Sequence, residues 1–208
     1  MGWGKPGQGV DAFGSDRIGV DGQPADARSE TIELVGTHLR VSGEVSLAHF
    51  GRLSDRINLN RGYIRLKDAR LLRRNGEPTP LIVPELMVNP DEITFVGQRA
   101  EDMSPAPSVR MADEDRPAIS RIRRQVVIFT AGHTLIGTIH TFAETDISSF
   151  VDSPDPRFVP MVDVTARSLA DRRVISHFAL ALVNRTEITA ASFLELAGGA
   201  AETGVAID

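Results

Sequence analysis

Apolar and polar residues alternate over short stretches of this chain, and the longest alternating stretches come as a matching pair. In residues 38–47 and again in residues 133–141, apolar side chains occupy every second position, with Gly43 or Gly137 at an inward place. Alternation with a period of two predicts a β-strand that buries one face. A glycine on that face permits a sharp bend or the close approach of another strand. The pattern therefore predicts one strongly bent strand in each half of the chain.

The segments that follow the two bent strands also match. Each is followed by a polar turn, a short apolar stretch, and a strand containing Asp68 or Asp163. Each then reaches an Asn-x-x-Glu-Ile-Thr segment, at Asn89 and at Asn184. Order and spacing persist throughout, so we interpret the chain as one β-rich unit used twice. The alternative is two unrelated β-rich stretches that share common strand residues.

A single helical turn is predicted after each bent strand. Leu53 and Ile57 lie four residues apart, and Ser54 or Asp55 could cap the turn. Residues 146–150 take the same place in the second unit. The rest of each unit is predicted to be strand and turn.

Composition marks the boundaries of the units. We predict a flexible arm over residues 1–30, a β-rich unit over 31–98, a linker over 99–120, a second unit over 121–195 and a flexible tail over 196–208. The arm and tail are rich in glycine and lack a periodic apolar pattern, and the linker is rich in proline and acidic residues. We expect two homologous curled-sheet barrels of the SH3-like kind, packed side by side as a pseudo-dimer. Barrels of this size have marginal cores and gain from covering a sheet edge.

Each unit resembles the Sm-like barrel pattern. The residues that carry this resemblance in the first unit are Gly36, Gly43, Asp55-Arg-Ile-Asn58 and Ile64-Arg-Leu-Lys-Asp-Ala69. The phrase Arg52-Leu-Ser-Asp-x-Ile-Asn, with the later Val-Asn-x-x-Glu-Ile, also resembles a bacterial domain family of unknown function. That second resemblance covers both units and implies tandem copies of one domain, without implying an activity.

Composition and charge restrict the classes of function. The net charge of −5 argues against nucleic-acid binding through bulk charge. The absence of cysteine excludes disulfides, thiolate metal sites and thiol nucleophiles. No run approaches the ~18 apolar residues of a spanning helix, and the N-terminus lacks the apolar core of a secretory signal. We therefore expect a cytoplasmic protein without a membrane span.

The candidate catalytic chemistry is sparse. The histidines lie singly, without the short spacing of a zinc site, so no metal is predicted. Asp68 and Asp163 could serve paired acid–base chemistry, but a carboxylate that accepts backbone N–H bonds where a strand ends explains one Asp per unit, and we favour this structural role. Neither a phosphate-binding loop nor a Gly-x-Ser-x-Gly elbow occurs, so we expect no cofactor and no enzymatic activity.

One basic cluster stands out in the sequence. It comprises Arg65, Lys67, Arg70, Arg73 and Arg74, with Arg65 and Lys67 on the outward face of a strand. The cluster could be a solvated strand face, or it could contact nucleic acid or another anionic partner.

We predict a non-enzymatic scaffold or accessory module that binds other proteins through exposed strand edges and through the arm. Trp3 and Phe13 are the anchors of that arm, and the same edges are compatible with a homo-oligomer. The alternative is a weak nucleic-acid binder that uses the face of Arg65, Lys67 and Arg70, and a third is a small anion or nucleotide held between the units.

Overall fold

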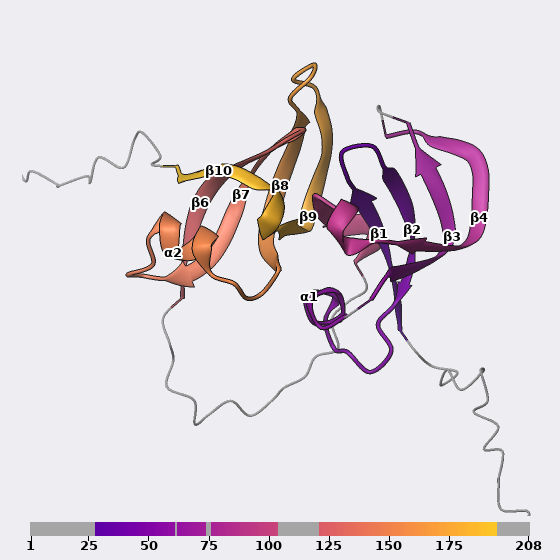
Figure 1. Ribbon diagram of the computed structural model, residues 1–208, viewed down its shortest axis with the longest axis horizontal. Helices are drawn as coiled ribbons and strands as arrows, with labels where there is room; N and C mark the ends of the chain where they lie inside the picture. The colour runs from indigo at the N-terminus through magenta and orange to yellow at the C-terminus, as the bar shows by residue number, and fades with distance from the viewer. Residues whose placement is uncertain (1–27, 61, 74–75, 104–120, 195–208) are drawn as a thin grey trace, which may run out of the picture.

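The computed structural model describes residues 28–60, 62–73, 76–103 and 121–194 (Figure 1). The strands are β1 (Ser29–Val35), β2 (Arg40–Ser46), β3 (Ile64–Leu72), β4 (Pro78–Val88), β5 (Phe95–Gln98), β6 (Arg121–Thr130), β7 (His133–Phe142), β8 (Phe158–Ser168), β9 (Val174–Asn184) and β10 (Ile188–Phe193). The helices are α1 (Leu53–Asn58) and α2 (Ile147–Asp152), with 3-10 turns η1 (Pro90–Glu92), η2 (Ala100–Asp102) and η3 (Arg185–Glu187). The predicted mainly β class is confirmed.

All ten strands belong to one sheet, in the order β10-β6-β7-β8-β9-β5-β1-β2-β3-β4, with antiparallel neighbours throughout. The sheet does not close on itself, whereas the sequence predicted two separate barrels. The difference arises at the centre, where β5 pairs with β9 and makes the two halves continuous. When an edge strand pairs with another strand, its outward N–H and C=O groups form hydrogen bonds and no longer have to be shielded in another way.

The first half (β1–β5) and the second half (β6–β10) have the same strand order, because the fifth strand of each lies beside its first. The bend is also the same. Gly43 lies opposite Ile32 in β1, and Gly137 lies opposite Val126 in β6.

Each glycine faces a bulge in the following strand. A register shift occurs between Ser42 and Glu44 where β2 meets β3, and another between Ile136 and Thr138 where β7 meets β8. The bulged residue is Asp68 in β3 and Asp163 in β8, with φ of 49° and 54°. Left-handed backbone is costly for most residues, but a short polar side chain such as Asp tolerates it. A Cβ on either glycine would lie 3.0 Å from a backbone oxygen of that strand, so the backbones approach closely only because the side chain is missing.

The buried residues form two hydrophobic cores, and each core contains side chains from both halves. Phe158 and Leu182 of the second half belong to the core of the first. Val35 and Phe95 of the first half belong to the core of the second. Neither core is therefore complete without the other half of the sheet.

The helical turns lie where the pattern predicts them. Leu53 and Ile57 are the buried residues of α1. The predicted cap of α1 is wrong: Arg52 occupies the N-cap position, and no side chain caps the turn. In α2, by contrast, Asp146 accepts a 2.6 Å hydrogen bond from the Ser149 N–H.

The predicted boundaries shift slightly. Ser29 and Glu30, assigned to the arm, begin β1, and Glu30 is buried. The start of the predicted linker contains η2. Trp3, Phe13, Arg74 and most of the arm, linker and tail lie outside the described residues.

Candidate functional site

The two halves meet at the paired strands β5 and β9, which we call the joint. Phe95 lies opposite Val183, and Gln98 lies opposite Leu180. All four residues of β5 are buried, as are the last residues of β9. The Phe178 ring covers Gly97 so closely that a Cβ on that glycine would lie 2.5 Å from a ring carbon. The joint is thus packed like a protein interior.

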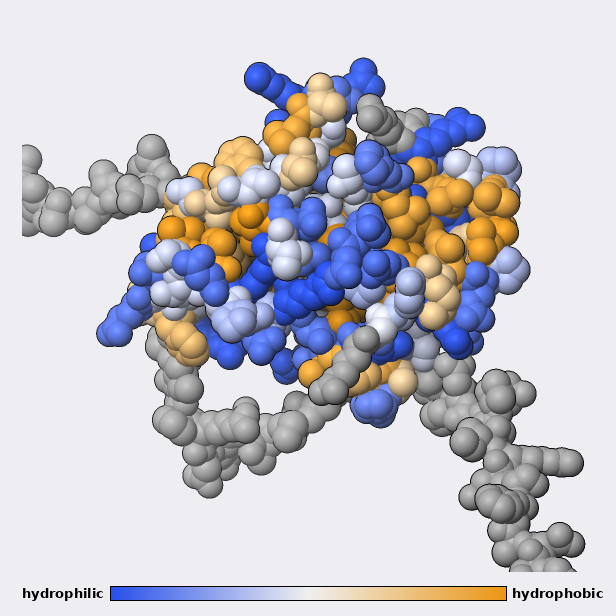
Figure 2. Space-filling model, in the orientation of Figure 1, coloured by the Kyte–Doolittle hydropathy of each residue, from blue (hydrophilic) through white to orange (hydrophobic). Residues whose placement is uncertain are grey.

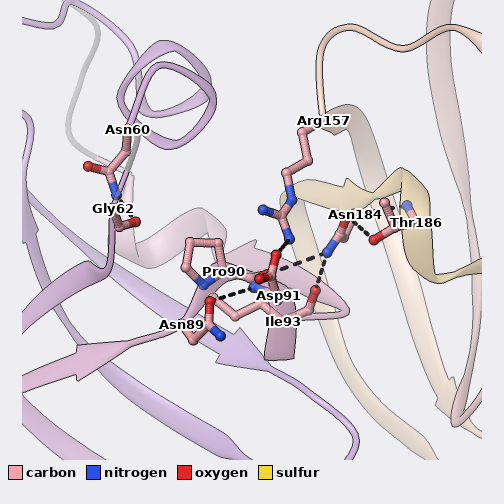
Figure 3. A network of polar contacts seen from close by, with 9 residues as sticks. All are labelled: Asn60, Gly62, Asn89, Pro90, Asp91, Ile93, Arg157, Asn184 and Thr186. Carbon is pink, nitrogen blue, oxygen red and sulfur yellow. Dashed lines mark hydrogen bonds and ion pairs between the residues drawn. The ribbon is translucent and has the colours of Figure 1, made fainter.

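Asn184 closes one end of the joint (Figure 3). Its backbone N–H donates to the Thr94 oxygen at 2.9 Å, and its side-chain amide donates to the Ile93 oxygen at 2.9 Å. Its side-chain oxygen accepts from the Thr186 N–H at 3.3 Å and so caps η3. Asn89 caps η1 in the same way, through the Asp91 N–H at 3.1 Å. The recurring asparagines therefore hold equivalent turns, and only Asn184 also bridges the halves.

Other polar contacts link the two halves beside the joint. The side-chain oxygen of Asn58 accepts from the Phe158 N–H at 2.8 Å, and its amide donates to the Phe158 oxygen at 3.0 Å, as a strand residue would. Asp91 and Arg157 form an ion pair at 2.6 Å (Figure 3). The Asp91 side chain is 72% exposed, so this pair contributes little stability.

The sheet has two free edges among the described residues, β4 at one end and β10 at the other (Figure 1). On β4, Leu81, Ile82 and Met87 are 53%, 48% and 48% exposed. Hydrophobic surface gathers at this end of the molecule (Figure 2). The β10 edge carries small side chains, with Ala190 and Ser192 exposed. Exposed apolar strand edges are potential sites for pairing with another chain.

The structure divides the predicted basic cluster between two hollows. Arg65 and Lys67 line a hollow of about 360 Å³ together with Tyr63 and Arg56. Arg70 lines a different hollow, of about 230 Å³.

The charges of this cluster are partly compensated. Arg65 donates to the Glu85 carboxylate at 2.8 Å, and Arg73 lies 4.0 Å from that of Glu77. Both pairs are about half exposed or more, so solvent also screens them. Strand β4 and the turn before it therefore supply acidic partners to the basic residues.

The hollow that Arg70 lines also contains Glu33, a buried carboxylate that the sequence reasoning missed. Arg40 and Arg99 form ion pairs with Glu33, at 2.5 and 3.3 Å. Nearby, partial burial raises the pKa of Asp102, and the charge of Glu101 raises it further. In the sequence, Glu33 lies between the apolar residues Ile32 and Leu34, as a solvent-facing residue of a strand would. In the fold, β5 and η2 lie beside it.

The recurring aspartates do not form an acid–base pair. Four strands separate β3, which carries Asp68, from β8, which carries Asp163. Paired acid–base chemistry needs both carboxylates in one cleft. Their shared feature is the left-handed backbone of the bulge.

Among the histidines, His133 has the most distinctive surroundings. Its ring meets Phe95 edge-on, with the ring centroids 5.6 Å apart. Burial lowers the pKa of His133, and the charge of Arg40 lowers it further. Across the described ranges, no cluster of three or more His, Cys, Asp or Glu side chains is arranged to hold a metal ion. In the same ranges, no helix is long and apolar enough to cross a membrane.

Comparison with protein-family models, with curated proteins and with solved structures finds no match for this chain. The geometry therefore carries the functional argument. Its main features are the joint, the two free edges and the hollow beside Arg65 and Lys67, of which the sequence predicted only the basic residues and the general use of strand edges.

Proposed function

We propose that the chain is a non-enzymatic scaffold or accessory module, built from two copies of one β unit, that binds other proteins through its free sheet edges. The observation that carries this proposal is the pair of free edges at opposite ends of one sheet, with apolar side chains exposed along β4. An edge strand binds a partner strand through backbone hydrogen bonds, and the side chains on either face give specificity.

The duplication within the proposal is supported by the backbone. The two halves share their strand order, the glycine at the bend, the bulged aspartate and the asparagine-capped turn. A copied unit explains why these four features recur in the same order.

The test is affinity capture with the full chain as bait, in parallel with a variant carrying Met87→Lys and Ala191→Lys. Lysine on an edge strand opposes strand addition. The matched control is Leu169→Lys, because Leu169 is also exposed and apolar but lies in the turn after β8. We expect proteins that wild type and the control retain and that the edge variant loses. Identical sets from all three baits would overturn the use of the edges.

The arm is tested with the same assay. Trp3→Ala combined with Phe13→Ala removes the two aromatic anchors of the arm. Loss of a partner from this bait alone would assign that partner to the arm, and an unchanged set would remove the arm from the proposal.

A second candidate function is weak binding of single-stranded nucleic acid. The observation that favours it is the hollow in which exposed Tyr63 lies beside Arg65 and Lys67, since an aromatic ring next to basic groups can stack a base and hold its phosphate. A gel shift at low salt that Arg65→Glu with Lys67→Glu abolishes would support this function. No shift for any single-stranded DNA or RNA at low salt would exclude it.

A further inference from the structure

The joint is a head-to-tail contact. It pairs the fifth strand of the first half, β5, with the fourth strand of the second half, β9. Among the described residues, two strands have a partner on one side only: the fourth strand of the first half, β4, and the fifth strand of the second half, β10. The molecule therefore carries at its two ends the two sides of the contact that it already makes at its centre.

We propose that β10 of one copy pairs antiparallel with β4 of the next copy, so that the sheet continues from chain to chain. This inference rests on the proposed function, because it names a second copy of this chain as the partner of the free edges. It deepens that function from edge binding in general to one contact of defined register.

The register follows from the strand pairings. Ile64 lies opposite Val88 in the first half, and Val159 lies opposite Val183 in the second, so positions 95 apart are equivalent here. The fifth strands have the same offset. Phe95 lies opposite Val35, and Ala190, which is 95 positions later, lies opposite Phe129, the equivalent of Val35 in β6. Transferring the joint onto the free edges pairs Ala190 with Val88, Ala191 with Met87, Ser192 with Leu86, and Phe193 with Glu85.

The backbone groups needed for this pairing point outward. The Asn184 N–H donates to Thr94 in the joint, and hydrogen-bonded pairs alternate along an antiparallel ladder, so Leu182 and Val96 also face each other. Their equivalents at the free edges are Met87 and Ala191. On β10 this is confirmed directly, because the Leu194 N–H donates inward to Gln125, which turns Ala191 and Phe193 outward.

The free edge of β4 offers a stretch of the same length as the joint. Residues 85–88 contain no proline and are the equivalents of the four residues of β9 that pair with β5. Because outward positions alternate along β4 from Met87, Pro84 lies at an inward position, and its missing N–H does not interrupt the outer edge. Four pairing residues match a short partner strand such as β10.

The side chains of the two free edges are complementary. In the joint, the large Phe178 covers Gly97. At the free edges, Val83, which is smaller than phenylalanine, takes the place of Phe178, and Ser192, which is larger than glycine, takes the place of Gly97. The register also places Glu85 opposite Phe193, whose ring carries the Arg124 guanidinium 3.5 Å from its centroid. The contact therefore brings the Glu85 carboxylate, which also pairs with Arg65, to the face that carries Arg124.

The two edges lie at opposite ends of the molecule (Figure 1), so one chain cannot close the contact on itself. A head-to-tail contact repeated between copies gives a ring if the rotation closes and a filament if it does not. Both are assemblies of this chain alone.

The first experiment is native mass spectrometry of the full chain over a dilution series, with Met87→Pro and Ala191→Pro as single variants. Each proline removes an outward N–H from one free edge and leaves the other edge intact. We expect wild type to form multiples of 22.6 kDa, each variant alone to be a monomer, and an equal mixture to form a dimer that grows no further. Circular dichroism and the unfolding midpoint of each variant verify that it is folded.

The second experiment does not depend on proline. The chain contains no cysteine, so single cysteines report only the contact. Under mild oxidation, Met87→Cys and Ala191→Cys chains should cross-link to each other, because opposite residues of an antiparallel pair have Cα atoms within disulfide range. Leu81→Cys, which is equally exposed on β4 but outside the contact, should not cross-link to Ala191→Cys.

The outcomes separate this inference from the proposed function. A wild-type chain that stays monomeric at every concentration, or a Met87→Cys chain that cross-links only to itself, would overturn the head-to-tail contact. If the edge-dependent capture of other proteins persisted in that case, the proposed function would stand without it. A cross-link between Met87→Cys and Ala191→Cys, with no edge-dependent capture of other proteins, would support the contact and overturn the wider binding function.

Discussion

The first and second halves of the sheet share one backbone plan but bury different side chains. Both have a glycine at the bend, a left-handed aspartate in the bulge, and a 3-10 turn capped by asparagine. The side chains around this frame differ. Phe178 in β9 is buried, whereas its equivalent Val83 in β4 is only partly buried.

The difference follows from position in the sheet. β9 pairs with β5 on the side away from β8, so it can bury a large aromatic ring against Gly97. β4 has no such neighbour in the described chain, and its outer residues stay exposed. The backbone features therefore set the curvature of each half, and the edge environment sets the side chains.

The largest expected effect comes from truncating the ring at the joint. Phe178→Ala removes a side chain that is 2% exposed and should lower the free energy of unfolding by about 4 kcal/mol. The equivalent change in the first half, Val83→Ala, should cost less than about 1 kcal/mol, because Val83 is only partly buried. Urea unfolding measures both, at a protein concentration at which the chain is monomeric. Equal losses from the two variants would mean that the joint does not distinguish the halves.

The glycines at the bend test the shared part of the plan. Gly43→Ala and Gly137→Ala should each lower the free energy of unfolding by about 1–3 kcal/mol, because the new methyl group meets a neighbouring strand at 3.2 Å or less. Gly132→Ala is the control, since a Cβ there meets nothing within 4 Å. Its effect should stay within about 0.5 kcal/mol.

The two bends differ in what a new methyl group would meet, and a second substitution tests this difference. The nearest obstacle to a Cβ on Gly137 is the Val164 side chain at 2.8 Å, whereas on Gly43 it is the Lys67 backbone oxygen at 3.0 Å. Val164→Ala should therefore offset part of the loss from Gly137→Ala. The combined cost should be smaller than the sum of the single costs in a double-mutant cycle. Strict additivity would show that the bend at Gly137 is relieved elsewhere.

The frame of each half could be predicted from the sequence, because its determinants are local. Alternation marks the bent strands, Gly43 and Gly137 mark the bend, and the i, i+4 pair of Leu53 and Ile57 marks α1. Asp68 and Asp163 were predicted as structural residues, and their left-handed backbone gives the physical reason.

The joint and the buried ion pairs could not be predicted in the same way. Leu182 and Met87 are both apolar residues near the end of a long strand, and only the pairing with β5 buries the first and exposes the second. Glu33 alternates with apolar neighbours as a solvent-facing residue would, yet it is 4% exposed because other elements cover it. Both features depend on contacts between segments far apart in the sequence, which periodicity does not report.

The smallest expected effect is a pH dependence of stability that arises from His133 of the second half. Burial and the nearby Arg40 charge hold the pKa of His133 below its ordinary value of 6.5, and its Nδ1 has no hydrogen-bond partner among the described residues. The unfolded chain therefore binds a proton more readily than the folded one. Stability is fully present above the unfolded pKa and falls as the pH drops below about 6.5. His133→Gln should flatten this part of the curve of unfolding free energy against pH, because glutamine keeps a polar side chain beside Phe95 without titrating. A wild-type curve that rises on acidification through this range would show that His133 gains a partner when protonated, and that burial does not control its charge.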